Sequence, residues 1–180
     1  MIYLFLADGF EEVEAITPID YIRRCNIEVC SVGINGKQIK GAHGVTVEAD
    51  MEISEFNPNQ VNDMLILPGG LHGTENLKSN NKVIESLKKA YVNGSIAAIC
   101  AAPSILGELG LLKGKKACCF PGFEKYLEGA KISFEPVVVD SNIITSRGPG
   151  TAQQFSFEIV EYLAGREKSN EIAQQVKWVF

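Results

Sequence analysis

The sequence has little positive charge and no long basic cluster, which argues against one broad class of partner. Its longest basic stretch is "KGKK" at 113–116, and its formal net charge is −5. Proteins whose main partner is nucleic acid or an anionic membrane present a strongly basic surface. We interpret the stretch as a solvated turn and expect no nucleic-acid-binding module.

Cysteines at zinc-binding spacing are also missing. The chain has five cysteines, an odd number, and no Cys-x-x-Cys pair. We therefore predict no metal site, and a cytoplasmic protein whose thiols stay reduced. The cysteines are Cys25, Cys30, Cys100, Cys118 and Cys119.

The first residues carry neither a positive leader nor a membrane span. The apolar run "MIYLFLAD" meets Asp8, Glu11, Glu12 and Glu14 at once, so it predicts a first core strand. No linker, repeat or low-complexity segment follows. With 46% hydrophobic residues in 180, we expect one domain over 1–180 with a sizeable core.

Short apolar runs alternate with helical patterns, which predicts an α/β fold. Runs such as "MLIL" and "IAAI" are apolar throughout, as in parallel strands that are buried on both faces. The expected architecture is a doubly wound, mostly parallel sheet. We predict strands at 2–7, 27–34, 64–68 and 95–100, and helices at 11–24, 82–93, 101–110, 151–164 and 167–178.

Two regions depart from this alternation. Residues 35–63 contain Asn35-Gly36 and the alternating "VTVEADMEI", which predict a small antiparallel excursion. Near the end, "EPVVVDSNIITSRGPG" predicts two short strands joined by a turn and followed by a Gly-Pro loop. Thr151 is the expected N-cap of the helix that comes next.

Three segments whose residues could take part in catalysis would meet at the carboxyl edge of the sheet, where such folds bind ligands. They are "DGFEEVE" at 8–14, "LPGG" at 67–70, and Cys100. Gly69 and Gly70 allow a sharp turn whose N–H groups could hold an anion, although such a pair is more often only a turn.

Cys100 ends an apolar run and precedes "AAPS", a possible helix start. A strand-to-helix turn would place the sulfur at the positive end of a helix, which favours the thiolate. The alternative is an inert buried cysteine.

Glu14 would have a catalytic role only if its carboxyl group lay beside such a sulfur. Glu11 and Glu14 share one face of the first helix, whereas Glu12 points elsewhere. Burial and a neighbouring thiolate would favour the protonated carboxyl group, a hydrogen-bond donor and general acid.

A histidine base for Cys100 is not evident locally. The chain has only His43 and His72, and Ala101 follows the cysteine directly. Both histidines are interpreted as exposed loop residues, so a Cys-His protease constellation is not supported.

Taken in order, "ADGFEEVEAITPIDYIRR", "LILPGG", "IAAICAAPSIL", "ITSRGPGTA" and "GREKSNEIAQQV" resemble the ThiJ/PfpI superfamily over essentially the whole chain. The similar branch is that of the parkinsonism-associated protein and bacterial YajL. The resemblance implies a flavodoxin-like sandwich with a nucleophile elbow, usually a homodimer. It also implies that Cys100 is the oxidisable nucleophile, that Glu14 is protonated beside it, and that the backbone donors are Gly69, Gly70 and Ala101.

The activities that the resemblance implies are a glutathione-independent glyoxalase and a deglycase of early glyoxal adducts on proteins and nucleotides, without metal or organic cofactor. The alternative is a redox sensor or chaperone that uses Cys100 sulfinate. A PfpI-type protease ranks lower, because it would need a histidine at Ala101.

Departures from the family pattern concern the surroundings of the cysteine. Phe120 stands where some relatives have a histidine, and His43 stands where they carry an arginine that crosses the dimer interface. We expect His43 to approach the partner's Cys100 pocket. With no histidine expected near Cys100 in its own chain, turnover should be modest. Arg24 is the candidate anion-holding cation, and Arg147 is expected to stabilise its loop.

Overall fold

A seven-stranded sheet forms the centre of the computed structural model, which describes residues 1–60 and 63–179. Its strand order is β10-β11-β7-β6-β1-β2-β5, and all neighbours pair in parallel except β10 with β11. The strands are β1 (Ile2–Leu6), β2 (Val29–Gly33), β5 (Met51–Glu52), β6 (Met64–Leu67), β7 (Ser95–Ile99), β10 (Val137–Asp140) and β11 (Ile143–Ser146).

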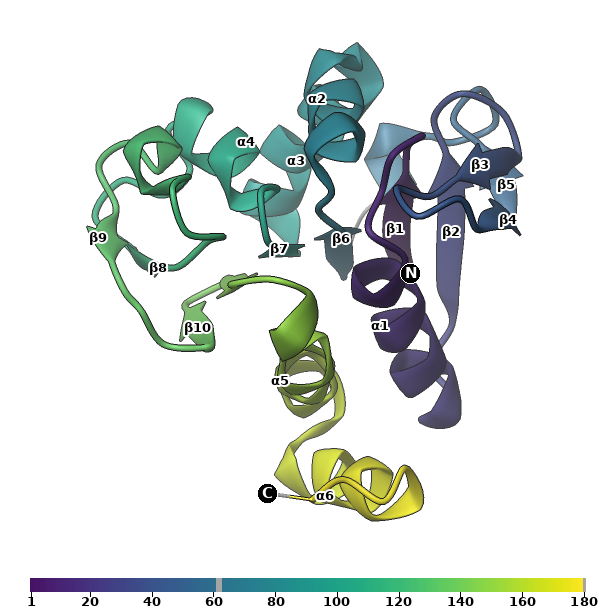
Figure 1. Cartoon of the computed structure of the whole chain (residues 1–180), viewed down its shortest axis with the longest axis vertical. Helices are drawn as coiled ribbons and strands as arrows, with labels where there is room; N and C mark the ends of the chain where they lie inside the picture. The colour runs from purple at the N-terminus through teal and green to yellow at the C-terminus, as the bar shows by residue number, and fades with distance from the viewer. Residues whose placement is uncertain (61–62, 180) are drawn as a thin grey trace.

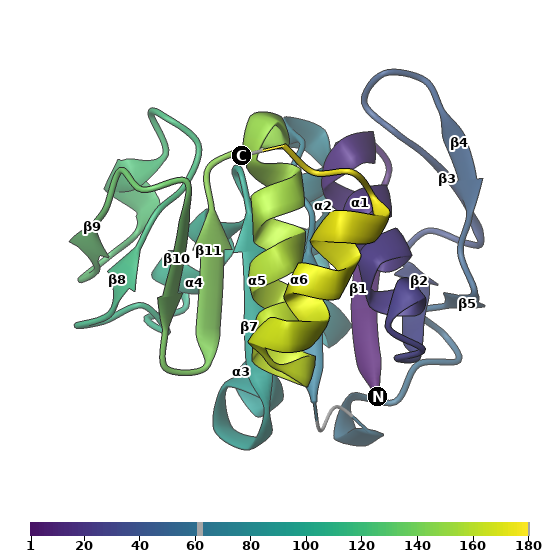
Figure 2. The ribbon, with the colours of Figure 1, turned by 90° about the horizontal axis from the view of Figure 1, so that it is seen from below.

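Helices cover both faces of this sheet, as the predicted doubly wound architecture requires (Figures 1 and 2). Helices α1, α5 and α6 lie on one face, and α2, α3 and α4 on the other. The helices are α1 (Glu12–Arg24), α2 (Leu71–Ser79), α3 (Asn81–Asn93), α4 (Pro103–Glu108), α5 (Ala152–Ala164) and α6 (Arg166–Gln175), with short 3-10 turns η1 (Pro58–Gln60), η2 (Glu124–Tyr126) and η3 (Pro149–Thr151).

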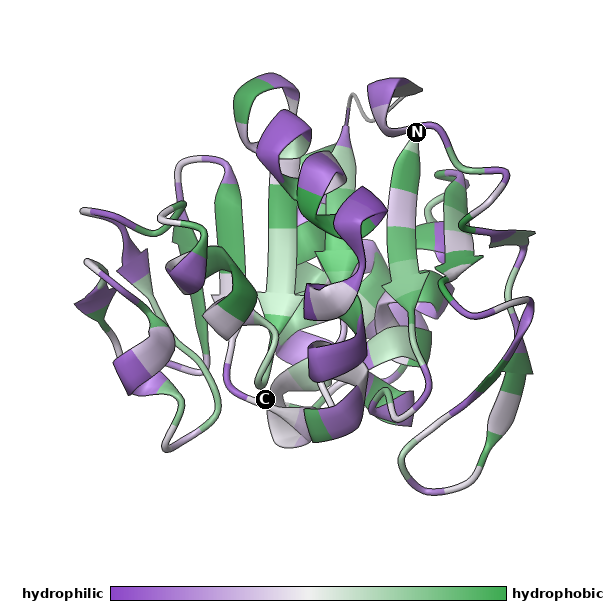
Figure 3. Ribbon diagram, turned by 90° about the horizontal axis from the view of Figure 1, so that it is seen from above, coloured by the Kyte–Doolittle hydropathy of each residue, from purple (hydrophilic) through white to green (hydrophobic). Residues whose placement is uncertain are grey.

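The apolar strands explain the two core layers. In β1, Tyr3 and Phe5 pack beneath α2 to α4, whereas Leu4 and Leu6 pack against α1 and α5. Successive side chains of a strand point to opposite faces, so a strand between two helix layers is apolar at every position. Figure 3 shows this contrast between green strands and the partly purple helices in front of them. No helix in the described ranges is long and apolar enough to cross a membrane.

The small excursion is confirmed in part. β3 (Gln38–Lys40) and β4 (Thr46–Glu48) form an antiparallel pair apart from the main sheet, but β5 joins that sheet in parallel beside β2. Residues 61 and 62 of the predicted excursion lie outside the described part of the chain. The two strands near the end are the antiparallel pair β10 and β11. A further short pair, β8 (Lys116–Ala117) with β9 (Lys131–Ile132), was not predicted.

The predicted helices need correction at three places. No helix was predicted where α2 lies, and the helix predicted at 101–110 is only α4, Pro103–Glu108. Thr151 does occupy the N-cap position of α5, but its hydroxyl makes no cap hydrogen bond. The Thr151 hydroxyl instead forms a hydrogen bond with Ser146 Oγ and accepts one from the Gly148 N–H. These two hydrogen bonds hold the Gly-Pro loop that precedes the helix.

Candidate active site

The three predicted segments do meet at the carboxyl edge of the sheet. The chain runs outward from β1 through β2 to β5 and then returns to β6 and β7 on the other side of β1. In such sheets the loops at this switch point enclose the ligand site. The loops touch directly, since the Glu11 N–H donates to Gly69 O at 3.1 Å and the Gly73 N–H donates to Gly9 O at 3.1 Å.

Cys100 lies on a strained turn between β7 and α4. Its φ of +66° is in the left-handed region, which costs a non-glycine residue about 1–3 kcal/mol. Two hydrogen bonds hold the turn: the Cys100 N–H donates to Ser146 O at 2.9 Å, and its carbonyl accepts from the Phe120 N–H at 2.8 Å. This backbone is the predicted nucleophile elbow.

Glu14 projects from the first turn of α1 toward the same point. It is fully buried, and its Oε2 accepts from the Gly69 N–H at 2.8 Å, while Oε1 has no hydrogen-bond partner. A Cβ on Gly69 would lie 2.6 Å from Glu14 Oε2 and 3.0 Å from Cys100 Sγ. The absence of a side chain at Gly69 therefore lets the carboxyl group and the thiol converge.

Burial raises the pKa of Glu14 to about 7, and its hydrogen bonds from Gly69 and Cys100 oppose this only in part. The direction agrees with the expectation that its carboxyl proton is favoured. At neutral pH, Glu14 can therefore both accept and donate a proton.

The thiolate expected at Cys100 is not favoured by its position. Burial raises the pKa of the Cys100 thiol to about 12, and the negative charge of Glu14 adds to the effect. Hydrogen bonds from the Gly70 and Ala101 N–H groups to the sulfur lower the pKa but do not compensate. The resting form is a thiol whose ionisation depends on where its proton goes.

The predicted set of backbone donors is corrected at one position. Gly69 donates to Glu14, so its N–H is not available to an anion on a ligand. Gly70 and Ala101 donate toward the sulfur, where a charge would develop. These two N–H groups are the candidate oxyanion donors.

Above Cys100 lies an open pocket of about 560 Å³. Apolar side chains form most of its wall, and Glu11 and two histidines lie at its mouth. Among the described residues its lining contains no lysine or arginine. The lining comprises Gly9, Glu11, Ala42, His43, Gly70, Leu71, His72, Cys100, Ala101, Phe120, Phe123 and Pro149.

Both histidines are exposed, as expected, with side chains of His43 and His72 that are 70% and 86% exposed. His43 and His72 both line the pocket of their own chain. His72 was interpreted only as an exposed loop residue, but it lies on α2, the helix that the sequence did not reveal. Whether His43 also approaches a partner chain stays a prediction.

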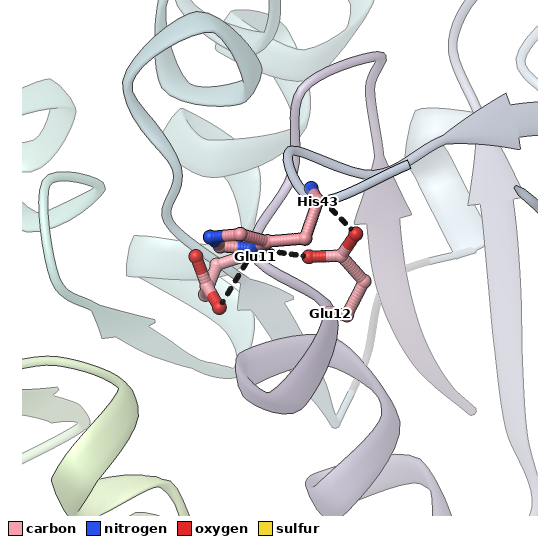
Figure 4. Close-up of side chains that lie close together, drawn as sticks. All are labelled: Glu11, Glu12 and His43. Atoms are coloured by element: carbon pink, nitrogen blue, oxygen red, sulfur yellow. Dashed lines mark hydrogen bonds and ion pairs between the residues drawn. The ribbon is translucent and has the colours of Figure 1, made fainter. Parts of the chain in front are cut away.

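His43 is held by the glutamates that begin α1, as Figure 4 shows. The ring nitrogen Nδ1 of His43 lies 2.9 Å from Glu12 Oε2 and 3.6 Å from Glu11 Oε1. The backbone N–H of His43 donates to Glu12 Oε1 at 2.8 Å. The hydrogen bond that the imidazole donates to the Glu12 carboxylate raises the pKa of His43. Glu12 points away from Glu14, as the helical spacing predicted.

Within its own chain, Arg24 lies away from this site. It pairs with Asp20 at 2.8 Å at the far end of α1, ten residues and about 15 Å of helix from Glu14. It lines a different hollow with Gln153 and Gln175. Arg147 donates to Phe134 O at 3.3 Å, which agrees with the expected loop role.

The sequence profile of the DJ-1/PfpI family matches residues 1–162. The chain belongs to the DJ-1/PfpI family. It is 41% identical over 173 residues to Protein DJ-1 homolog B of Arabidopsis thaliana, which covers 94% of this chain but only 39% of that longer protein. It is 34% identical over 165 residues to a protein of Pyrococcus abyssi named as a deglycase, covering 90% and 98% of the two chains.

Solved structures agree with this family assignment. Oxidized Toxoplasma gondii DJ-1 superposes with a TM-score of 0.94 at 32% identity, covering 99% of this chain and 98% of that one. The predicted ThiJ/PfpI resemblance and the flavodoxin-like fold are confirmed.

Proposed function

We propose that this DJ-1/PfpI protein is a cysteine-dependent enzyme that converts methylglyoxal or glyoxal into a hydroxy acid without glutathione, metal or organic cofactor. The observation that carries the proposal is the pair at the pocket floor, a thiol on a strained elbow beside a buried carboxyl group with one free oxygen. The pocket lining, apolar and without lysine or arginine in its described part, suits a small neutral dicarbonyl.

In the first step, Cys100 Sγ attacks the aldehyde carbon and a C–S bond forms. The carbonyl π electrons move to oxygen, and the thiol proton passes to the Glu14 carboxylate, which then protonates the new alkoxide. The N–H groups of Gly70 and Ala101 stabilise the anion that develops beside the sulfur. The product is a hemithioacetal on Cys100.

In the second step, Glu14 takes the proton from the carbon that carries sulfur, exchanges it with water and then protonates the adjacent carbon. The hydroxyl proton on the first carbon passes to the carbonyl oxygen of the second. Together these transfers move two electrons within the substrate and convert the hemithioacetal into a thioester, so no external oxidant is needed. Water then cleaves the thioester, releasing the hydroxy acid and restoring the Cys100 thiol. The net reaction of methylglyoxal is addition of one water to give lactate.

The test is lactate formation from methylglyoxal without glutathione. We expect many lactates per chain from the native protein and none from Cys100→Ser. Cys30→Ser is the matched control, because Cys30 is a half-buried thiol on β2 whose loss should leave turnover unchanged. Equal activity in native protein and Cys100→Ser would contradict the proposal.

The same site could act on early adducts of dicarbonyls with proteins and nucleotides, and we propose this deglycase activity as its second substrate class. An adduct loses its aldehyde spontaneously at a fixed rate, which sets its lifetime. A deglycase acts on the adduct itself and makes the lifetime shorter than this. An enzyme that uses only the free aldehyde can at most reach that limit. Adduct decay at increasing protein concentration separates the two, because only the scavenger's rate reaches a plateau.

A second candidate function is redox sensing, with a chaperone role after oxidation. It is favoured by Glu14 Oε1, which is buried without a partner and, when protonated, can donate to an oxygen on Cys100. Two molecules of peroxide would convert the thiol to the sulfinic acid, with two waters released. We place either role in the cytoplasm, where free thiols such as the five described here stay reduced.

Intact-mass and peptide analysis after peroxide treatment tests this alternative. Stepwise addition of two oxygens to Cys100 supports it. Cys118 and Cys119 are buried and, unlike Cys100, do not line the pocket, so the competing thiols are the half-buried Cys25 and Cys30. Oxidation of those two before Cys100 would count against a sensor.

A further inference from the structure

Glu11, Glu12 and His43 form a cluster of potential metal ligands at the pocket mouth (Figure 4). One ligand atom from each residue lies within 4.8 Å of the other two. The ring nitrogen Nδ1 of His43 is 2.9 Å from Glu12 Oε2 and 3.6 Å from Glu11 Oε1. The proposed reaction uses none of these three side chains.

These separations match the coordination shell of a transition-metal ion. Nitrogen and oxygen ligands stand about 2.0–2.2 Å from zinc, so neighbouring ligands of a tetrahedral ion are roughly 3.3 Å apart. The distances from His43 Nδ1 to the two carboxylate oxygens, 3.6 and 2.9 Å, lie on either side of that value. Binding would need only small side-chain movements.

The loop after β3 fixes the central carboxylate of the cluster. Glu12 Oε1 accepts from the N–H groups of His43 at 2.8 Å and Val45 at 3.4 Å, which leaves Oε2 for the imidazole. A Cβ on Gly41 would lie 2.3 Å from Glu12 Oε1, so the loop backbone closes around the carboxylate. Such supporting hydrogen bonds orient ligands at metal sites.

Charge and exposure also favour a cation. The side chains of Glu11 and Glu12 are only 16% and 13% exposed, whereas that of His43 is 70% exposed. Two adjacent, mostly buried carboxylates repel each other, and a single imidazolium balances one of them. A divalent ion would balance both, and its open coordination positions would face water.

We propose that Glu11, Glu12 and His43 bind one divalent transition-metal ion, such as Zn²⁺, at the mouth of the Cys100 pocket. One imidazole with two carboxylates suits zinc and its neighbours better than magnesium or calcium, which prefer oxygen ligands alone. The ion replaces the proton between His43 Nδ1 and Glu12 Oε2. This site goes beyond the proposed reaction and does not depend on it.

The test is titration of Cys100→Ser protein with Co²⁺, followed by visible absorption and by competition with Zn²⁺. We expect one equivalent to bind, with the absorption of a four- or five-coordinate ion and without a thiolate charge-transfer band. His43→Ala and Glu12→Gln should each weaken binding at least about tenfold. His72→Ala is the matched control, since its ring lies at the same mouth 3.7 Å from a single carboxylate, that of Glu75.

Three outcomes would overturn the site. They are no saturable binding in the micromolar range, which would leave only an ion pair; a thiolate band, which would place the ion on another cysteine; and unchanged affinity in His43→Ala. Because Cys100 is already replaced, none of these outcomes depends on whether the protein turns over dicarbonyls.

Discussion

At Cys100 and Glu14, burial favours the protonated form of both side chains. It raises the pKa of Glu14 to about 7 and that of Cys100 to about 12, and the Glu14 carboxylate makes the thiolate still less favourable. At neutral pH the thiol keeps its proton, so the proton must move to a nearby base as the sulfur attacks. Turnover at the cysteine therefore depends on the glutamate, although thiolate formation does not.

Replacing Glu14 by Gln tests this dependence. Without the carboxylate the pKa of Cys100 should fall, so alkylation by iodoacetamide should reach its half-maximal rate at lower pH than in the native protein. Lactate formation should nevertheless fall at least about 100-fold, because the proton shuttle is lost. Glu85→Gln on the exposed side of α3 is the control. A faster alkylation with full lactate production would remove Glu14 from the mechanism.

The raised pKa of Glu14 also predicts how stability changes with pH. Below its ordinary value of 4.5 both the folded and unfolded chains hold the proton; between 4.5 and about 7 only the folded chain keeps it. Stability therefore falls as pH rises through this window, by about 3 kcal/mol from this group, and then levels off. Urea unfolding at several pH values should show this loss relative to Glu14→Gln. A constant difference between the two proteins would contradict the assignment.

The sequence permits prediction of this residue pair but not of all its surroundings. Glu14 falls on the buried stripe of α1 with Ala15, Pro18 and Ile22, and a glutamate in that place needs a functional reason. The contact of His43 with Glu12 joins residues 31 positions apart through a loop, which no helical or strand period reveals. Arg24 shares the helix with Glu14, but periodicity along a helix does not say which end meets the pocket.

Among the elements, α2 shows best why sequence pattern is insufficient. Its buried residues are Gly73, Thr74 and Leu77, so it has almost no apolar stripe. The helix packs through its backbone instead: a Cβ on Gly73 would lie 2.8 Å from Phe10 Cα. The apolar period that identifies most helices is absent, because close approach of two backbones takes its place.

Gly70 at the start of α2 should tolerate no side chain. Its φ is +87°, and an added Cβ would lie 2.2 Å from Gly9 O, a backbone atom that cannot swing away. Gly110→Ala is the matched control, since Gly110 has φ +72° but open space around it and should cost about 1–2 kcal/mol. Urea unfolding should show at least twice that loss for Gly70→Ala, and lactate formation should fall with it. Equal losses in both variants would contradict the close packing of the loops.

Across the whole molecule, the order of strands places the chemistry. Strands that are apolar at every position predicted the doubly wound sheet, and the carboxyl edge was the expected place for a ligand. What the sequence could not supply was the edge strand β5, only two residues long, and the relative placement of loops. Those loops decide which N–H serves Glu14 and which serves the sulfur.

The homodimer expected from the family resemblance stays a prediction at this scale. Val13 and Ile16 on the outer side of α1, with Val45 on the nearby loop, are 47%, 44% and 54% exposed. Burying such side chains against a second copy would remove apolar surface from water. Light scattering of the native protein should give twice the chain mass of 19.6 kDa. The double variant Val13→Glu with Ile16→Glu should give the mass of a single chain. A native protein that stays at 19.6 kDa as its concentration is raised would contradict the dimer.

The central claim is that Cys100 and Glu14 together turn methylglyoxal into lactate by moving protons between the protein and the substrate. The most direct measurement is mass analysis of lactate formed in D₂O without glutathione. We predict many lactates per chain, each with deuterium at carbon 2 taken up through Glu14. Consumption of at most one methylglyoxal per chain without lactate, or lactate that retains only protium at carbon 2, would contradict the account.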